Sequence, residues 1–325
     1  MRGPLADETV LRRLISAAEA APSIHNTQPW RFRVAGEDII ELRGDPDRML
    51  WVADPRGHAL HLSCGAALYN LRLAIRVAGF KPLVWPLPDT GHEPTLLAVV
   101  QLAAGRPGTV VEQELFEATA ARHTNRAPFS DAPVPRTLRA DLEQAASLEY
   151  AALRLLSRQE TMRVIECAAA ADGELASDPM HVSEMRQWIS AGGTGDGVPP
   201  QLLGPRPDEE LAPVRDLGKG RPDPGRPVGH FEARPQLAVL STTHDEPADW
   251  LRAGQALQCV LLTATRHGLA ASFLYQPIEL HEMRMTDGWW PWPEQPQMII
   301  RFGYGPPAAG SPRRLFTDIL DPLVD

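Results

Sequence analysis

The chain has 325 residues, enough for two domains or one large one. Hydrophobic residues make up 43% and charged residues 22%, which is typical of a soluble globular protein and excludes a disordered chain. The net charge of −9 argues against a nucleic-acid-binding protein and against one that binds an anionic membrane surface.

The three cysteines, Cys64, Cys167 and Cys259, are far apart and form no CxxC pair. This spacing predicts neither a disulfide framework nor a zinc ribbon. No stretch approaches 18 uncharged apolar residues, and no basic start followed by an apolar run suggests a signal peptide. We therefore expect a cytoplasmic protein that does not enter the membrane.

The first expected element is a helix near residues 7–20, with Asp7 as its cap and Pro22 after its end. A polar loop over residues 21–29 follows. Residues 30–34 and 39–42 are then expected to form two strands joined by a turn through Gly36.

A repeat links the two halves of the chain. Gly65 and Gly254 each open a matching Ala/Leu-rich helix in this interpretation, and the two helices end at Gly79 and Gly268, a constant offset of 189 positions. An apolar strand follows each helix, at residues 96–102 and 298–302. The repeat predicts two related α+β units, residues 1–108 and 109–325.

Residues 180–230 interrupt the second unit with 8 prolines and 9 glycines in 51 positions. Such a composition excludes long regular elements. The segment is either a disordered linker or an ordered, lid-like loop. Its apolar residues, among them Trp188 and Phe231, favour the ordered loop, because they need a surface on which to dock.

Two segments carry side chains suited to a ligand. Arg122, Thr124 and Arg126 can converge on one dianion, and Arg313-Arg314 adds a second basic pair. Equally, these arginines could form ion pairs with carboxylates on a solvated face.

The loop over residues 22–29 offers the amide and hydroxyl groups of Asn26, Thr27 and Gln28. Such groups can read the polar edge of a planar heterocycle by hydrogen bonds. An ordinary helix-to-strand connection would also use these residue types.

Four motifs carry a resemblance to a known family. Residues 21–30 resemble the A-P-S-x-x-N-x-Q-P-W loop of the nitroreductase-like FMN flavoproteins, and residues 122–126 resemble their R-x-S-x-R phosphate motif with Thr for Ser. Residues 277–280 resemble their P-I-E-G segment, with Leu280 in place of Gly. Gly303-Tyr304-Gly305 followed by Arg313-Arg314 resembles their C-terminal motif. The resemblance is strongest to the Acg-type branch, in which two nitroreductase-like units are fused.

The resemblance implies an α+β fold whose two units form a pseudo-dimer with mixed or antiparallel sheets flanked by helices, so that the chain acts as a monomer. The first unit lacks the arginine motif. The second unit carries that motif but reads Ala-Ser-Asp-Pro-Met-His at residues 176–181, where its polar loop is expected. One FMN site per chain follows. The cofactor-binding residues that it implies are Pro22, Ser23, Ile24, Asn26, Arg122, His123, Thr124, Arg126, Pro277, Ile278, Glu279, Arg313 and Arg314.

Two functions fit this interpretation. In the first, the chain is an oxidoreductase whose FMN takes a hydride from NAD(P)H at N5 and reduces a nitroaromatic, a quinone or a similar small acceptor. In the second, it sequesters FMN beneath the lid with little or no turnover, as Leu280 and the insertion suggest. Neither function requires a catalytic side chain, and we assign none. We also expect no metal, since His58 and His61 have no carboxylate partner at ligand spacing.

Overall fold

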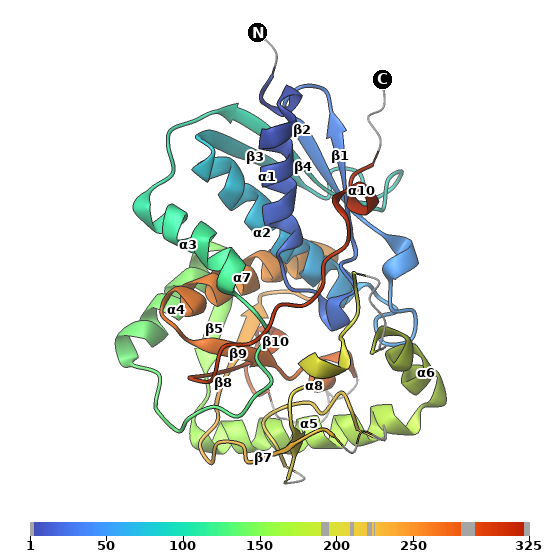
Figure 1. The fold of residues 1–325 in the computed structure, drawn as a ribbon, viewed down its shortest axis with the longest axis vertical. Coiled ribbons are helices and arrows are strands. Elements are labelled where there is room, and N and C mark those ends of the chain that lie inside the picture. The colour runs from blue at the N-terminus through green and yellow to red at the C-terminus, as the bar shows by residue number, and fades with distance from the viewer. Residues whose placement is uncertain are drawn as a thin grey trace.

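The computed structural model describes residues 3–189, 195–208, 211–219, 223, 225–280 and 290–321 (Figure 1). Its first half contains a four-stranded antiparallel sheet in the order β1-β2-β4-β3. Helix α1 (Glu8–Glu19) and helix α2 (His58–Val77) pack against this sheet and against each other. The strands are β1 (Trp30–Ala35), β2 (Ile39–Gly44), β3 (Phe80–Pro86) and β4 (Leu96–Ala104).

The expected first elements are confirmed. The Asp7 carboxylate accepts a hydrogen bond from the Thr9 amide at 2.8 Å and so caps α1, as an aspartate at this position commonly does. Gly36, between β1 and β2, has a φ of 73°, a value that favours glycine. Short 3₁₀ turns lie at Pro4–Ala6, Ile24–Asn26 and Pro46–Arg48.

The second half repeats this plan. Its antiparallel sheet has the order β5-β8-β10-β9. Along the chain, each half has two strands of its sheet, then a long helix, then two more strands. The members are α4 (Arg136–Leu148), β5 (Ala152–Leu155), β8 (Gln236–Thr242), α7 (Pro247–Arg266), β9 (Ala270–Phe273) and β10 (Gln295–Gly303). The predicted α+β class with antiparallel sheets is therefore confirmed.

Helices α2 and α7 are the centre of the molecule, and both bounds of α7 lie 189 residues after those of α2. The predicted repeat offset is thus correct, but the predicted helix starts are wrong. Gly65 and Gly254 lie inside the helices, where the two helices cross. At such a crossing glycine is retained because it lets two backbones approach closely.

The sequence analysis misplaced the second unit's counterpart of the polar loop. By topology, α4 and β5 correspond to α1 and β1, and only residues 149–151 connect them. Residues 176–181 instead join helix α5 (Arg158–Ser177) to helix α6 (Pro179–Trp188). The sequence analysis misplaced this loop because the insertion begins at residue 156, well before the Pro/Gly-rich residues by which it was recognised.

The described parts of the insertion are ordered and fold on their own small core. Met185, Ile189, Val198 and Leu203 are buried together there. The regular elements beyond α6 are short: a 3₁₀ turn at Pro200–Leu202 and a parallel pair of β6 (Arg206–Pro207) and β7 (Val228–Gly229). For these residues the ordered-loop alternative is the one observed.

The last part of the chain returns to the first half. After β10 it runs up beside α1 (Figure 1) and forms α10 (Phe316–Ile319), which packs on β1. The Asp321 amide donates to the carbonyl of Phe32 at 2.7 Å. The C-terminal segment therefore lies beside the first sheet, although the division expected from the sequence assigned it to the second unit.

The remaining expectations concern cysteines, metals and membranes. Cys64, Cys167 and Cys259 are buried, and no disulfide joins any two of them. Within the described ranges, no cluster of three or more His, Cys, Asp or Glu side chains could hold a metal ion. No helix among these residues is both long and apolar enough to span a bilayer.

Candidate functional site

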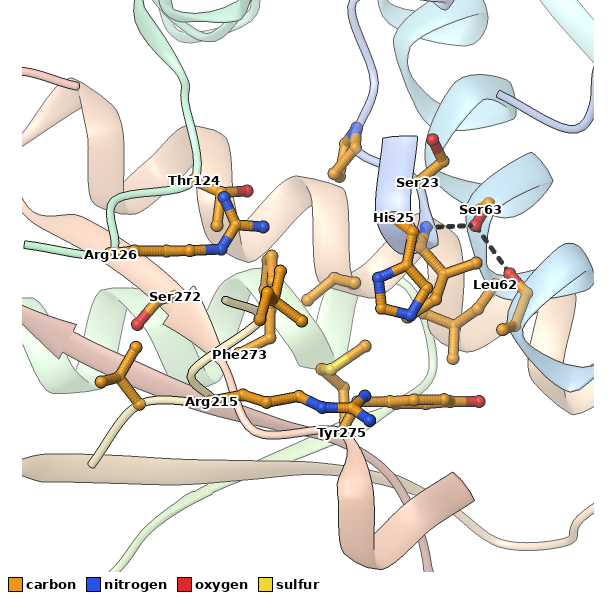
Figure 2. Close-up of a pocket in the computed structure, with 17 residues that line it drawn as sticks. Ser23, His25, Leu62, Ser63, Thr124, Arg126, Arg215, Ser272, Phe273 and Tyr275 are labelled. Carbon is orange, nitrogen blue, oxygen red and sulfur yellow. Dashed lines mark hydrogen bonds between the residues drawn. The ribbon is translucent and has the colours of Figure 1, made fainter. Parts of the chain in front are cut away.

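A cavity between the two halves gathers several of the predicted segments (Figure 2). The space between its walls totals about 810 Å³, a figure that includes space open to solvent. Its walls combine apolar side chains with a few polar ones. We call it the central cavity, and it is lined by Pro22, Ser23, Ile24, His25, Ala59, Leu62, Ser63, Thr124, Arg126, Val214, Arg215, Leu217, Leu257, Ser272, Phe273, Tyr275 and Met298.

The polar loop reaches the cavity in a strained conformation. His25, Asn26 and Gln28 have positive φ values of 46°, 56° and 49°. For residues other than glycine this left-handed backbone costs about 1–3 kcal/mol each, and it is concentrated at functional sites. The Ser23 hydroxyl accepts the Gln28 amide at 2.9 Å and helps to hold the turn.

Asn26 does not line the central cavity. Its Nδ2 donates to the carbonyl oxygens of Gly197 and Pro312, both at 3.0 Å, and its Oδ1 accepts from Arg313 Nη1 at 2.6 Å. Gln28 Nε2 donates to the Gly195 carbonyl at 2.8 Å. These two amides therefore connect the loop to the insertion and to the C-terminal segment.

Arg122 and Arg313 converge on one backbone oxygen. Their Nη2 atoms both donate to the carbonyl of Ala20, at 3.2 and 3.1 Å. Arg122 is only 5% exposed, and its Nε has no hydrogen-bond partner among the described residues. Burial, with the neighbouring Arg313 charge, lowers the pKa of Arg122 to about 9.

Arg126 and Thr124 stand at the other end of the arginine motif. The Arg126 guanidinium lies beside Thr124 in the wall of the central cavity (Figure 2). Burial lowers the pKa of Arg126 to about 10, and its Nη1 donates only to the Leu202 carbonyl, at 3.1 Å. No carboxylate pairs with Arg122 or Arg126 in the described chain, so the alternative of solvated ion pairs does not hold for these two.

A second cavity adjoins the first. It contains Arg122, His123 and Asn125, and it shares Thr124 and Phe273 with the central cavity. The nearby charges of Arg122 and Arg313 add to burial in lowering the pKa of His123, which keeps this imidazole neutral at pH 7. The arginine motif thus lies between two adjoining cavities.

The insertion contributes one wall of the central cavity through Val214, Arg215 and Leu217. Arg215 Nη1 donates to Glu279 Oε2 at 3.0 Å, and Glu279 Oε1 is 2.6 Å from His181 Nε2. Burial alone would raise the pKa of Glu279, but Arg215 and His181 outweigh it and hold the pKa below its usual value. Glu279 therefore fastens the insertion to the short helix α8 (Gln276–Glu279).

The predicted site residues fall into three groups. Those that line one of the two cavities are Pro22, Ser23, Ile24, Arg122, His123, Thr124 and Arg126. Those that tie segments together around them are Asn26, Glu279, Arg313 and Arg314, the last of which donates to the carbonyls of Gln28 and Trp30. Pro277 and Ile278 are buried in α8 and line neither cavity.

Sequence reasoning missed several lining residues, including His25, Arg215 and Tyr275. His25 could have been found, since it stands within the quoted loop motif. The positions of Arg215 and Tyr275 depend on how the insertion and β9 pack, which no local pattern encodes.

The chain matches no protein-family model. It is similar over nearly its whole length to curated relatives from Mycobacterium tuberculosis. One, named "Putative NAD(P)H nitroreductase Rv3131", is 31% identical over 98% of this chain and 95% of its own length. The chain belongs to the nitroreductase-like flavoprotein superfamily. This confirms the family resemblance.

A second relative places the chain near the predicted branch of the superfamily. The M. tuberculosis protein "Putative NAD(P)H nitroreductase acg" is 28% identical over 95% of each chain. Among solved structures, a nitroreductase with bound FMN from Desulfitobacterium hafniense covers 65% of this chain and 98% of its own, at 14% identity and a TM-score of 0.40.

Proposed function

We propose that this chain binds one FMN across the two adjoining cavities and transfers a hydride from NAD(P)H to a small acceptor such as a nitroaromatic or a quinone. The observation that carries the proposal is the convergence of Arg122 and Arg313 on the Ala20 carbonyl. Two guanidinium groups at one oxygen repel each other. A bound dianion would relieve that repulsion, and a phosphate is the dianion that arginine forks bind best.

The buried polar atoms fit this cofactor. A buried cation without a counter-charge costs several kcal/mol, and Arg122 Nε finds no partner among the described residues to reduce that cost. In this proposal Arg122 and Arg313 hold the phosphate together with Thr124 and Arg126. Pro22, Ile24 and the apolar lining residues of the second half would enclose the ring and exclude water.

FMN, when bound, supplies the hydride chemistry, so the protein needs no acid or base of its own. What the chain contributes is position and environment. The loop at residues 22–25 and the wall formed by Phe273, Tyr275 and Met298 come from opposite halves of the chain. The site therefore requires both units, which supports an internal pseudo-dimer with one flavin.

The arginine variants test the phosphate assignment. Arg122→Ala and Arg126→Ala should each weaken FMN binding about 10–100-fold, because each removes a charge-assisted contact. Arg106→Ala, at an exposed arginine that lines neither cavity, is the matched control. Heat-released flavin quantified against protein should give about one FMN per wild-type chain. Folded arginine variants that keep their full FMN would contradict the assignment, as would two flavins per chain.

Sequestration of FMN is the second candidate function, and one observation favours it: Val214, Arg215 and Leu217 of the insertion already line the central cavity. A wall at this place would restrict the approach of a nicotinamide. Replacing residues 190–226 with a short Gly/Ser linker should then speed reduction by NAD(P)H and expose the flavin to iodide quenching. The comparison is made on flavin-loaded protein. Unchanged rates and quenching at full occupancy would leave the oxidoreductase as the better description.

A further inference from the structure

Building on the proposed FMN site, we propose that the imidazole of His25 forms the hydrogen bond to the polar edge of the bound ring. The family resemblance gives this kind of contact to the neighbouring Asn26. Asn26 instead acts as a positioning residue that holds the insertion and the C-terminal segment against the loop. The class of ligand that His25 would bind is a neutral planar heterocycle with an imide-like edge.

His25 is a buried polar side chain without a protein partner at the cavity. It is 7% exposed, and its Nε2 has no hydrogen-bond partner among the described residues. Figure 2 shows its ring standing between Ser63 on one side and Arg215 and Tyr275 on the other. An unpartnered buried nitrogen costs about 1–3 kcal/mol, which a ligand hydrogen bond would recover.

The hydroxyl groups around His25 already have partners in the protein. Ser63 Oγ donates to the Ala59 carbonyl at 2.7 Å and accepts the Ile24 amide at 3.3 Å. Ser23 Oγ accepts the Gln28 amide, and Ser272 Oγ accepts from Arg301 at 3.2 Å. Among these groups, His25 Nε2 is the buried atom that has no hydrogen-bond partner in the described part of the chain.

The charge state of His25 selects the ligand class. Burial, followed by the charge of Arg215, lowers the pKa of His25 to about 3, so the imidazole is neutral at pH 7. A neutral imidazole has one donor and one acceptor nitrogen. Depending on the tautomer, Nε2 can donate to a carbonyl oxygen or accept from an N–H, and a neutral imide-like edge presents both groups side by side. The anionic end of the ligand belongs to the arginines.

The loop geometry explains why His25 and not Asn26 faces the cavity. The left-handed backbone at both positions turns consecutive side chains in different directions. The amide of Asn26 is engaged through both Nδ2 hydrogens and through Oδ1. Its backbone carbonyl also accepts the Gly197 amide at 3.2 Å. These bonds hold the strained turn that directs His25 inward.

Titration of the flavin-free full-length chain with FMN and with riboflavin, followed by flavin fluorescence, tests the assignment. Riboflavin has the same ring but no phosphate. His25→Met should weaken the binding of both flavins by the same factor, about 5–20-fold, as expected for one buried hydrogen bond. Arg122→Ala should weaken FMN binding only. His92→Met, at an exposed histidine far from the cavity, should change neither.

His25→Gln separates a hydrogen bond from packing. Gln and Met have similar size and the same backbone strain at this position, but only Gln has a donor and an acceptor. Gln should therefore restore affinity to within about 3-fold of wild type. Equal losses in the Gln and Met variants would overturn the inference, and so would a loss confined to FMN or no loss at all. A wild-type chain that binds neither flavin would refute the proposed function itself, and this inference with it.

Discussion

Gly65 and Gly254 face each other where α2 and α7 cross. A Cβ atom added to Gly65 would lie 2.2 Å from the carbonyl oxygen of Leu251, and one added to Gly254 would lie 2.1 Å from that of Leu62. The two contacts are equivalent under the 189-residue offset. The crossing is therefore a two-fold-like junction that tolerates no side chain on either helix, and it brings together the halves that form the cavity.

We expect Gly65→Ala to destabilise the chain by about 1–3 kcal/mol or more, because the obstructing atom is backbone and cannot rotate away. The measurement is the free energy of unfolding from urea titration. Gly173→Ala is the matched control: Gly173 lies in the exposed face of α5 with nothing within 4 Å of an added Cβ. That control should stabilise by about 0.5–1 kcal/mol, as alanine does in a helix. Equal effects of the two substitutions would contradict the close crossing.

Glu19, the last residue of α1, should make stability depend on pH. Its Oε2 is buried without a hydrogen-bond partner in the described part of the chain. Burial raises the pKa of Glu19 to about 7, although the Arg313 charge partly opposes this. Because the folded pKa lies above the unfolded one, the protonated carboxyl contributes stability that is fully present below pH 4.5. That stability is lost as the pH rises through 7.

Glu19→Gln should therefore be more stable than wild type at pH 8, by about 1–2 kcal/mol once the partial exposure of the side chain is allowed for. The difference should shrink toward pH 4.5 and level off above pH 7. Urea unfolding at pH 4.5, 6 and 8 measures it. A difference that stays constant across this range would show that Glu19 titrates normally in the folded chain.

Glu184 on α6 should anchor the insertion to the first half. Its carboxylate accepts the amides of Val52 and Ala53, at 3.1 and 2.9 Å. Glu184→Ala removes both bonds and should favour local opening of the insertion by about 1–2 kcal/mol, or ~5–30-fold. Limited proteolysis of the insertion measures this opening. Glu174→Ala, at an exposed position of α5, should leave the cleavage rate unchanged, and the same rate in the Glu184 variant would show that the anchor contributes nothing.

The sequence by itself determined the local secondary structure and the two segments whose side chains suit a ligand. Asp7 and Pro22 bound the first helix correctly, because capping and chain stops depend on neighbouring residues. The 189-residue offset revealed the paired helices, since each repeats the same apolar pattern. The arginine motif and the polar loop also stood out, since their residue types are distinctive and close in sequence.

Only the tertiary structure decided which of these side chains face a common space. Gly65 looked like a helix start because glycine is usually a breaker, but the crossing with α7 gives it a packing role inside the helix. Asn26 looked like a ligand contact, yet its amide is engaged by Gly197, Pro312 and Arg313, which are distant in the chain. Such assignments follow from long-range contacts, and hydrogen-bonding capacity alone does not show which partner a side chain will take.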